Sequence, residues 1–419
     1  PAAAAAPSAT DRARALRALR AAPLVDGHND LPWAVREHTP GSNAPDGGAE
    51  SGRGALADSL PVPPDVEGYD LRGRAPGATD LARLRAGALG GQFWSVYVPG
   101  EPADGAYARR GRVASAPGYA RVQLEQIDAA RRIIARHPDR LTLALRAADV
   151  APAARAGKVA GLLGMEGGHA IENSLGALRT YYDLGVRYMT LTHNVTLDWA
   201  DAALDSARHG GLTPFGERVV GEMNRLGMLV DLSHTSDGTA LDALRVSRAP
   251  VIWSHSSARA LCDHPRNLPD SILARVRANG GVVMVTFVGS FVSQAVRDHQ
   301  RERERVRSSA APGAQRAAAA AWDRAHPAPR ATLAQVADHI EHVRRVAGAD
   351  HVGVGGDFDG TSDLPVGLED VSTYPALFAE LARRGWSDAD LRKLAGGNVL
   401  RALARAERVA ADLRRTSRR

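Results

Sequence analysis

The sequence predicts one (β/α)8 (TIM) barrel with loop insertions, and three observations support this fold class. Short apolar runs alternate along the chain with longer helical patterns rich in Ala, Leu and Arg. Eight such runs occur, which is the number of strands that closes this barrel. Polar residues able to bind metal follow several runs, where parallel strands converge on one face of a barrel. The alternation also allows an open doubly wound sheet, which is the alternative fold.

The predicted strands are rich in Val, Leu, Ile and aromatic residues. They cover residues 24–30, 92–98, 159–166, 186–194, 228–234, 251–255, 281–287 and 351–357. The second strand has the weakest pattern, because a Gly/Pro-rich stretch (39–79) precedes it and a Gly/Ala/Arg insertion (100–118) follows it. Both stretches are predicted to be surface loops.

Five helices are predicted between the strands from apolar residues at helical spacing. They cover residues 119–136, 175–184, 215–226, 239–248 and 333–346. A charged and Ala-rich stretch, 290–330, is predicted to pack on the barrel as an excursion or to form a lid. Along the chain we expect an N-terminal extension or helix (1–23), the barrel domain (24–403) and an Arg-rich tail (404–419).

The composition argues against several classes of protein. The net charge of the 419-residue chain is +6, but its basic residues lie in Ala/Arg stretches without aromatic residues. This pattern is typical of solvated helix faces and predicts no nucleic-acid partner. No apolar run is long enough to span a membrane. The lone Cys262 excludes an intramolecular disulfide, so a cytoplasmic location is expected. Secretion stays open, because the chain starts at Pro1 and upstream residues could have been removed.

Five residues at predicted strand ends are candidate metal ligands. His28 and Asp30 end the first strand two positions apart, so both side chains project to the same face. Glu166 ends the third strand among small residues, and a carboxylate there is able to bridge two cations. His234 and His255 end the fifth and sixth strands, which places two imidazoles on neighbouring strands.

Together these residues predict two three-ligand sites that share one glutamate. Each site leaves room for water, which is typical of a catalytic rather than a structural metal centre. A structural zinc site would be closed by cysteines, and this chain has one cysteine. A single histidine at a strand end is more often a hydrogen-bonded structural residue, but five matching strand ends favour the metal centre.

Three further residues complete the candidate site. His193 ends the fourth strand, where its imidazole could donate to the oxygen of a tetrahedral intermediate or support a ligand from behind. Asp357 ends the eighth strand and is placed to move a proton from water to a leaving amine, although Asp359 lies only two residues on. Arg266 follows the sixth strand and offers a planar fork for a substrate carboxylate, with a surface salt bridge as the alternative.

The motifs around these residues resemble those of the membrane (renal) dipeptidase family of the amidohydrolase superfamily. They are, in order, VDGHNDLPW (25–33), EGGH (166–169), YMTLTHN (188–194), GMLVDLSH (227–234), SHSS (254–257), DHPRN (263–267) and GGDFDG (355–360). The resemblance covers about residues 24–403, nearly the whole chain, and its motifs are highly specific.

This resemblance implies a zinc dipeptidase with two Zn²⁺ ions per chain. It implies that His28 and Asp30 bind the first zinc, that Glu166 bridges, and that the second zinc is bound by His234 and His255. It further implies that His193 binds the scissile carbonyl oxygen, that Arg266 binds the C-terminal carboxylate and that Asp357 transfers the proton. In the family a metal-bridging hydroxide attacks the peptide bond of free dipeptides. Family members tolerate a D-configured C-terminal residue, and some cleave dehydropeptides or carbapenem-type β-lactams.

The chain departs from the animal members of this family in three ways. It reads Thr286, Phe287 and Val288 where those enzymes carry a tyrosine that helps to hold the substrate carboxylate, so recognition would rest more on Arg266. It has neither paired cysteines nor a hydrophobic C-terminal tail. These departures indicate a bacterial-type member, and a homodimer is compatible with the sequence.

Two other functions compete with the dipeptidase. One is a different reaction of the amidohydrolase type, such as lactone, deaminase or phosphoester chemistry, at the same metal centre. The other is a non-catalytic binding protein on a decayed barrel. The intact set of candidate ligands argues against the second of these functions.

Overall fold

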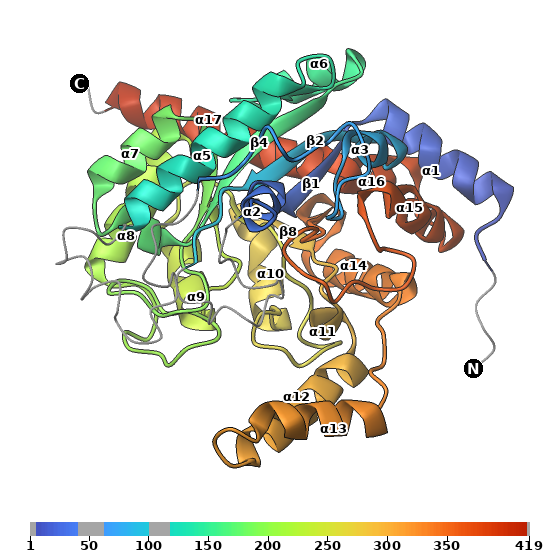
Figure 1. Cartoon of the computed structure of the whole chain (residues 1–419). Coiled ribbons are helices and arrows are strands. Elements are labelled where there is room, and N and C mark those ends of the chain that lie inside the picture. The colour runs from blue at the N-terminus through green and yellow to red at the C-terminus, as the bar shows by residue number, and fades with distance from the viewer. Residues whose placement is uncertain (1–5, 41–62, 100–117, 417–419) are drawn as a thin grey trace.

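The computed structural model describes residues 6–40, 63–99 and 118–416 and confirms the (β/α)8 barrel (Figure 1). Its parallel barrel strands are ordered β1-β2-β4-β5-β6-β7-β8-β9, so each strand lies beside the next one in the chain, while β3 pairs with β4 outside this path. The strands are β1 (Leu24–Asn29), β2 (Leu89–Ser95), β3 (Leu141–Leu143), β4 (Val159–Glu166), β5 (Val186–Thr190), β6 (Leu229–Asp231), β7 (Val251–Trp253), β8 (Val282–Val285) and β9 (Val352–Val354).

The first and last strands meet at their carboxyl ends and bring the barrel nearly to closure. Asn29 forms a parallel bridge with Phe358. The Asp30 amide donates to the Phe358 carbonyl at 2.9 Å, and the Asp357 amide donates to the His28 carbonyl at 3.1 Å. In an open doubly wound sheet the first strand lies inside the sheet and the strand order reverses beside it. Here the strands follow the order of the chain and the first meets the last, so that alternative is wrong.

The strands differ from the predicted ranges in ways that have physical reasons. β2 begins at Leu89 rather than at residue 92, because two glycines at its start weaken the apolar pattern although they are buried in the sheet. β6 ends at Asp231 instead of residue 234, because His234 adopts a positive φ of 66° that a strand does not allow. The short β3 was missed, since a three-residue edge strand carries almost no periodicity.

The predicted helices form near their expected positions. α5 (Tyr119–Arg136) has the predicted bounds. α7 (Leu175–Asp183), α8 (Pro214–Leu226), α9 (Asp237–Val246) and α14 (Leu333–Ala347) agree with prediction to within two residues at each end. Capping sets these bounds: at α8 the Thr213 side chain accepts from the Gly216 amide, and Gly227 ends the helix with φ 89°.

Further helices cover the barrel and its ends. The α-helices are α1 (Ala9–Ala21), α2 (Leu31–Glu37), α3 (Leu81–Ala86), α6 (Ala147–Arg155), α10 (Asp270–Asn279), α11 (Gly289–Val292), α12 (Gln294–Ser309), α13 (Gln315–Ala325), α15 (Tyr374–Arg383), α16 (Asp388–Arg392) and α17 (Asn398–Thr416). Short 3-10 or π turns lie at η1 (Gly168–Ile171), η2 (Ala349–His351), η3 (Val371–Thr373) and η4 (Lys393–Gly397). α17 crosses the boundary predicted at residue 403, and the division of the chain into three segments stays a prediction.

The predicted excursion at 290–330 is a pair of helices, α12 and α13, that stands away from the barrel (Figure 1). Arg303 of α12 and Asp323 of α13 form an ion pair at 2.7 Å. The Trp322 ring contacts the rings of His299 and His326, whose centroids lie 4.5 and 4.6 Å away. Of the loops predicted at 39–79 and 100–118, only residues 39–40, 63–79 and 118 lie within the described part of the chain, and they form no strand.

The barrel interior is filled with side chains, so it forms a floor rather than a channel. Phe93 and Tyr188 are fully buried there, with ring centroids 5.0 Å apart. The Tyr188 ring occupies the space that a side chain at Gly164 would need, which explains this glycine in β4. Among the helices of the described ranges, none combines the length and the apolar character required to cross a membrane.

Candidate metal centre and active site

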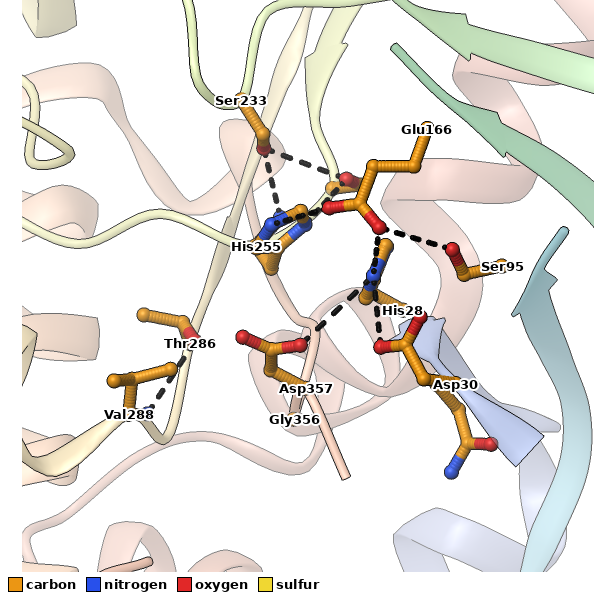
Figure 2. A network of polar contacts seen from close by, with 12 residues as sticks. His28, Asp30, Ser95, Glu166, Ser233, His255, Thr286, Val288, Gly356 and Asp357 are labelled. Carbon is orange, nitrogen blue, oxygen red and sulfur yellow. Dashed lines mark hydrogen bonds and ion pairs between the residues drawn. The ribbon is translucent and has the colours of Figure 1, made fainter. Parts of the chain in front are cut away.

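The structure brings the five predicted ligands together at the carboxyl ends of the strands. His28 lies in β1, and Asp30 is the first residue after this strand. Glu166 is the last residue of β4, while His234 and His255 follow β6 and β7. All five residues are buried, with exposed fractions from 0% to 8%. Figure 2 shows Glu166 reaching between His255 on one side and His28 with Ser95 on the other.

The two carboxylate oxygens of Glu166 face different groups. Oε2 lies 3.4 Å from His28 Nε2, which in turn lies 3.2 Å from Asp30 Oδ2. Oε1 lies 3.0 Å from His234 Nε2 and 3.4 Å from His255 Nε2. The Ser95 hydroxyl donates to Oε2 at 3.1 Å and helps to orient the carboxylate. Each oxygen therefore faces one pair of candidate ligands, as expected of a bridging carboxylate.

These candidate ligand atoms lie close together, and one of them has no hydrogen-bond partner in the described part of the chain. His28 Nε2 is buried and has no hydrogen-bond partner among the described residues, although two carboxylates lie close to it. His234 Nε2 and His255 Nε2 lie 2.9 Å apart, which brings two imidazole nitrogens together beside the same glutamate oxygen. An imidazole and carboxylate donor set of this kind suits Zn²⁺. The residues present therefore fit a metal centre.

The other ring nitrogen of each candidate ligand histidine contacts an oxygen atom. His28 Nδ1 lies 2.8 Å from the Tyr188 hydroxyl. His234 Nδ1 lies 2.9 Å from Asn194 Oδ1, and His255 Nδ1 lies 2.9 Å from Ser254 Oγ. Such contacts hold the rings with Nε2 toward the centre, in the way that supporting residues orient metal ligands.

Sequence reasoning missed these supporting residues. Asn194 and Ser254 are adjacent in the chain to His193 and His255, and this adjacency was the only signal for them. Tyr188 reaches His28 across the barrel interior from β5, so nothing in the sequence around His28 indicates the contact.

Burial and neighbouring charges shift the pKa values of the clustered groups. Burial lowers the pKa values of His234 and His255 well below the usual range, which favours the neutral imidazole that binds metals. For Glu166, burial would raise the pKa, but His28 and His234 together hold it well below the usual value. For His28, burial is outweighed by Tyr188, Glu166 and Asp30, and its pKa is raised. The carboxylates of Glu166 and Asp30 thus favour a positive charge beside them.

His193 lies beside the cluster, three residues after the end of β5. Its ring centroid lies 4.4 Å from that of His234 and 5.1 Å from that of Tyr97. Burial lowers the pKa of His193 to about 4, and its Nδ1 has no hydrogen-bond partner among the described residues. The ligand atoms of His193, Glu166 and His234 all lie within 4.8 Å of one another, so geometry alone would also allow His193 as a ligand.

Arg266 is buried at the same mouth, with an exposed fraction of 3%. Its guanidinium donates to Ser256 Oγ at 3.3 Å and to the His255 carbonyl at 3.4 Å, while its Nε has no partner. No carboxylate of the described ranges lies within ion-pair distance of it, so the surface salt bridge considered from the sequence is absent there. Burial lowers its pKa to about 10, against the attraction of Asp357, Glu166 and Asp231. A buried guanidinium without a paired anion is suited to bind one.

Asp357 follows β9 and faces His28, with 3.8 Å between Oδ1 and His28 Nε2 (Figure 2). Its φ is 60°, an unusual conformation for a non-glycine residue that turns the carboxylate toward the centre. Burial raises the pKa of Asp357 to about 7. Asp359 instead accepts a hydrogen bond from the Ala78 amide at 2.5 Å, so the structure distinguishes the two aspartates.

Gly360 packs against both carboxylates of this region. A Cβ atom at this position would collide with Asp30 Oδ2 and Asp357 Oδ1. We expect Gly360→Ala to displace both carboxylates and to lower kcat/KM by about a hundredfold, because small displacements of reacting groups have effects of this size. Steady-state kinetics would measure it. Gly221→Ala in α8 is the control, since nothing lies within 4 Å of its added Cβ. Wild-type kinetics for Gly360→Ala would contradict the described packing.

The chain is similar to known peptidases over almost its full length. The family model described as membrane dipeptidase (peptidase family M19) matches residues 12–417. Dipeptidase 3 from Rattus norvegicus is 39% identical over 403 residues, which cover 95% of this chain and 68% of that relative.

Solved structures show the same likeness. A metallo-peptidase from Rhodobacter sphaeroides, liganded with a phosphinate mimic of the dipeptide L-Ala-D-Ala, is 27% identical with a TM-score of 0.69, covering 92% of this chain and 99% of its own. Dipeptidase AC, a metallo-peptidase of family M19, is 26% identical with a TM-score of 0.69, covering 92% and 98%. The probable dipeptidase PvdM from Pseudomonas aeruginosa is 23% identical with a TM-score of 0.76 over 96% and 99%, a likeness of fold.

The family match, the sequence identity to a dipeptidase and the cluster of imidazoles and carboxylates at the barrel mouth agree with one another. The chain therefore belongs to the membrane dipeptidase family, peptidase family M19, whose members are metal-dependent dipeptidases.

Proposed function

We propose that the chain hydrolyses the peptide bond of free dipeptides at a centre of two zinc ions. The observation that carries this proposal is the position of Glu166, which directs one oxygen to His28 and the other to His234 and His255. In this proposal His28, Asp30 and Glu166 hold the first ion. Glu166, His234 and His255 hold the second. When bound, the ions would polarise the substrate carbonyl and provide a water that ionises near neutral pH.

Arg266 binds the C-terminal carboxylate of the dipeptide. Support comes from its burial, from its unpartnered Nε and from the absence of an ion-pair partner in the described residues. A guanidinium presents two parallel donors to a carboxylate, so it fixes both the position and the direction of the substrate. This contact selects dipeptides that have a free terminal carboxylate.

His193 and Asp357 act on the reacting atoms. A neutral His193 donates a hydrogen bond to the scissile carbonyl oxygen and stabilises the charge that develops there, an assignment that fits its lowered pKa. Asp357 accepts a proton from the attacking water and passes it to the leaving amine nitrogen. Its burial and its direction toward His28 support this role.

We include both L,L- and L,D-dipeptides among the substrates. The Rhodobacter sphaeroides relative, 27% identical, is liganded with a mimic of L-Ala-D-Ala. That likeness supports tolerance of a D-configured C-terminal residue in this chain. The location in the cytoplasm and the homodimer stay predictions from the sequence.

A panel of L,L- and L,D-dipeptides tests the proposal. The purified protein is loaded with zinc, its metal content is measured on the same sample, and release of free amino acids is followed. Cleavage of several dipeptides by protein with about two zinc ions per chain is expected. If fully loaded protein leaves the whole panel intact, the proposed substrate class is wrong.

Arg266→Met separates a dipeptidase from another hydrolase of the amidohydrolase type. Loss of the charge-assisted contacts should raise the KM for dipeptides roughly 10- to 100-fold, because hydrogen bonds to charged groups contribute this much. A dipeptide amide lacks the terminal carboxylate and should be cleaved equally slowly by wild type and variant. Equal effects of the substitution on both substrates would show that Arg266 does not read the carboxylate.

A further inference from the structure

A buried carboxylate, that of Asp231, accepts hydrogen bonds from the residues that precede His234 and His255. Asp231, the last residue of β6, has no exposed surface, and four groups donate to it. They are the hydroxyls of Thr190 (2.5 Å) and Ser254 (2.6 Å), both to Oδ2, and the amides of Ser254 (2.8 Å) and Ser233 (3.1 Å), both to Oδ1. Asp231 thus ties β6 to β5 and β7, the strands next to it in the sheet.

These contacts determine where the Ser254 proton lies. A hydroxyl has one proton, and an ionised carboxylate only accepts hydrogen bonds. The 2.6 Å contact to Asp231 Oδ2 is short and charge-assisted, so the Ser254 proton points to Asp231. The other acceptor recorded for this hydroxyl, Ser233 Oγ, lies farther away at 3.4 Å.

The direction of the Ser254 proton fixes the protonated nitrogen of His255. Ser254 Oγ lies 2.9 Å from His255 Nδ1. Because its one hydroxyl proton is donated in the hydrogen bond to Asp231, Ser254 can only accept a hydrogen bond from His255. His255 Nδ1 must therefore carry the ring proton, which leaves the lone pair on Nε2. That nitrogen faces Glu166 and His234. In the opposite tautomer a proton would occupy the direction that a metal requires.

His255 differs from the other two ligand histidines in this respect. His28 is supported by the Tyr188 hydroxyl and His234 by the Asn194 amide oxygen, both neutral groups. Of these three supporting groups, only the Ser254 hydroxyl behind His255 donates to a carboxylate of the described residues. Asp231 also binds the amides of Ser233 and Ser254, the residues that immediately precede His234 and His255.

We infer that Asp231 is a positioning residue that acts through Ser254 to fix the tautomer of His255, and so sets the affinity of the second metal position. This inference rests on the proposed two-metal centre and assigns to Asp231 a role without direct contact with metal or substrate. It accounts for a buried, unpaired carboxylate at the junction of three strands, where an apolar residue would otherwise be expected.

Asp231→Asn reverses the proposed proton direction. The two backbone amides at Oδ1 can only donate hydrogen bonds, so the oxygen of the Asn side chain stays beside them. Its NH2 group then faces the hydroxyls of Thr190 and Ser254. Ser254 then accepts a hydrogen bond from the Asn NH2 group and donates one to His255 Nδ1, so the ring proton of His255 lies on Nε2. Ser254→Ala removes the same connection with less disturbance of the fold.

The experiment starts from the intact chain, strips it of metal and titrates Zn²⁺ back against a competing chelator. In Asp231→Asn and in Ser254→Ala, the second zinc should bind about 10- to 100-fold more weakly, with the first little changed. The double variant should bind the second zinc no more weakly than the single variant with the lower affinity, because both substitutions break the same connection between Asp231 and His255. Thr190→Val is the matched control, because Thr190 donates to the same Asp231 oxygen without contacting a histidine. It should keep second-zinc affinity within about twofold of wild type.

The outcomes separate the inference from the proposed function. A wild-type chain that binds only one zinc ion would overturn the two-metal centre itself. A wild-type chain with two zinc ions, together with undiminished second-site affinity in Ser254→Ala, would overturn the inference alone. The inference alone would also be overturned if Asp231→Asn weakened binding of the second zinc as strongly in the Ser254→Ala background as in wild type. It would likewise be overturned if Thr190→Val weakened this binding as much as Asp231→Asn does. Should Asp231→Asn fail to fold, Ser254→Ala decides the question.

Discussion

Replacement of Glu166 by Gln is expected to empty at least one metal position and to lower kcat by about a thousandfold or more. The wild-type carboxylate presents one oxygen to His28 and the other to His234 and His255. An amide presents an oxygen to one side and an NH2 group to the other, and NH2 does not bind cations. Loss of several kcal/mol of metal-derived stabilisation of the transition state corresponds to a rate loss of this size. Metal analysis and steady-state kinetics on one preparation measure both effects.

Ser95→Ala is the matched control for Glu166→Gln. Ser95 donates to Glu166 Oε2, so its loss removes an orienting hydrogen bond but leaves the carboxylate in place. We expect about two zinc ions per chain in Ser95→Ala and a much smaller loss of activity than in Glu166→Gln. Full metal content in Glu166→Gln would show that the glutamate does not join the two positions.

Asp357→Asn is expected to lower kcat by roughly a hundredfold or more while the metal content remains unchanged. An amide preserves the size of the side chain but removes the site that accepts and passes on a proton, and proton transfer contributes a factor of this order. Metal analysis is essential to this test, because ligand atoms of Asp357, His28 and His255 lie within 4.8 Å of one another. Loss of zinc from Asp357→Asn would make Asp357 a ligand instead of a proton carrier.

The cluster could be predicted from the sequence because its members stand at strand ends. The spacing of His28 and Asp30 placed both side chains on one face, and the barrel then brought Glu166, His234 and His255 to the same mouth. No side-chain contact had to be known for this step. The regular alternation of strands and helices was sufficient.

Other features depend on tertiary contacts and left no pattern in the sequence. Tyr188 supports His28 from the opposite side of the barrel interior, and Asp231 reaches His255 only through Ser254. The turns at His234 and Asp357 have positive φ values, which side chains other than glycine rarely adopt. Their backbone strain is accepted where surrounding contacts hold the residue, and such contacts cannot be read from local sequence.

We propose that two zinc ions share Glu166 between the His28–Asp30 pair and the His234–His255 pair. A crystal structure of the zinc-loaded chain, with anomalous scattering measured at the zinc absorption edge, tests it most directly. We expect two anomalous peaks, each at about 2.0–2.2 Å from one Glu166 oxygen and from the nearest histidine nitrogens. A single peak, or two peaks of which only one contacts Glu166, would contradict it.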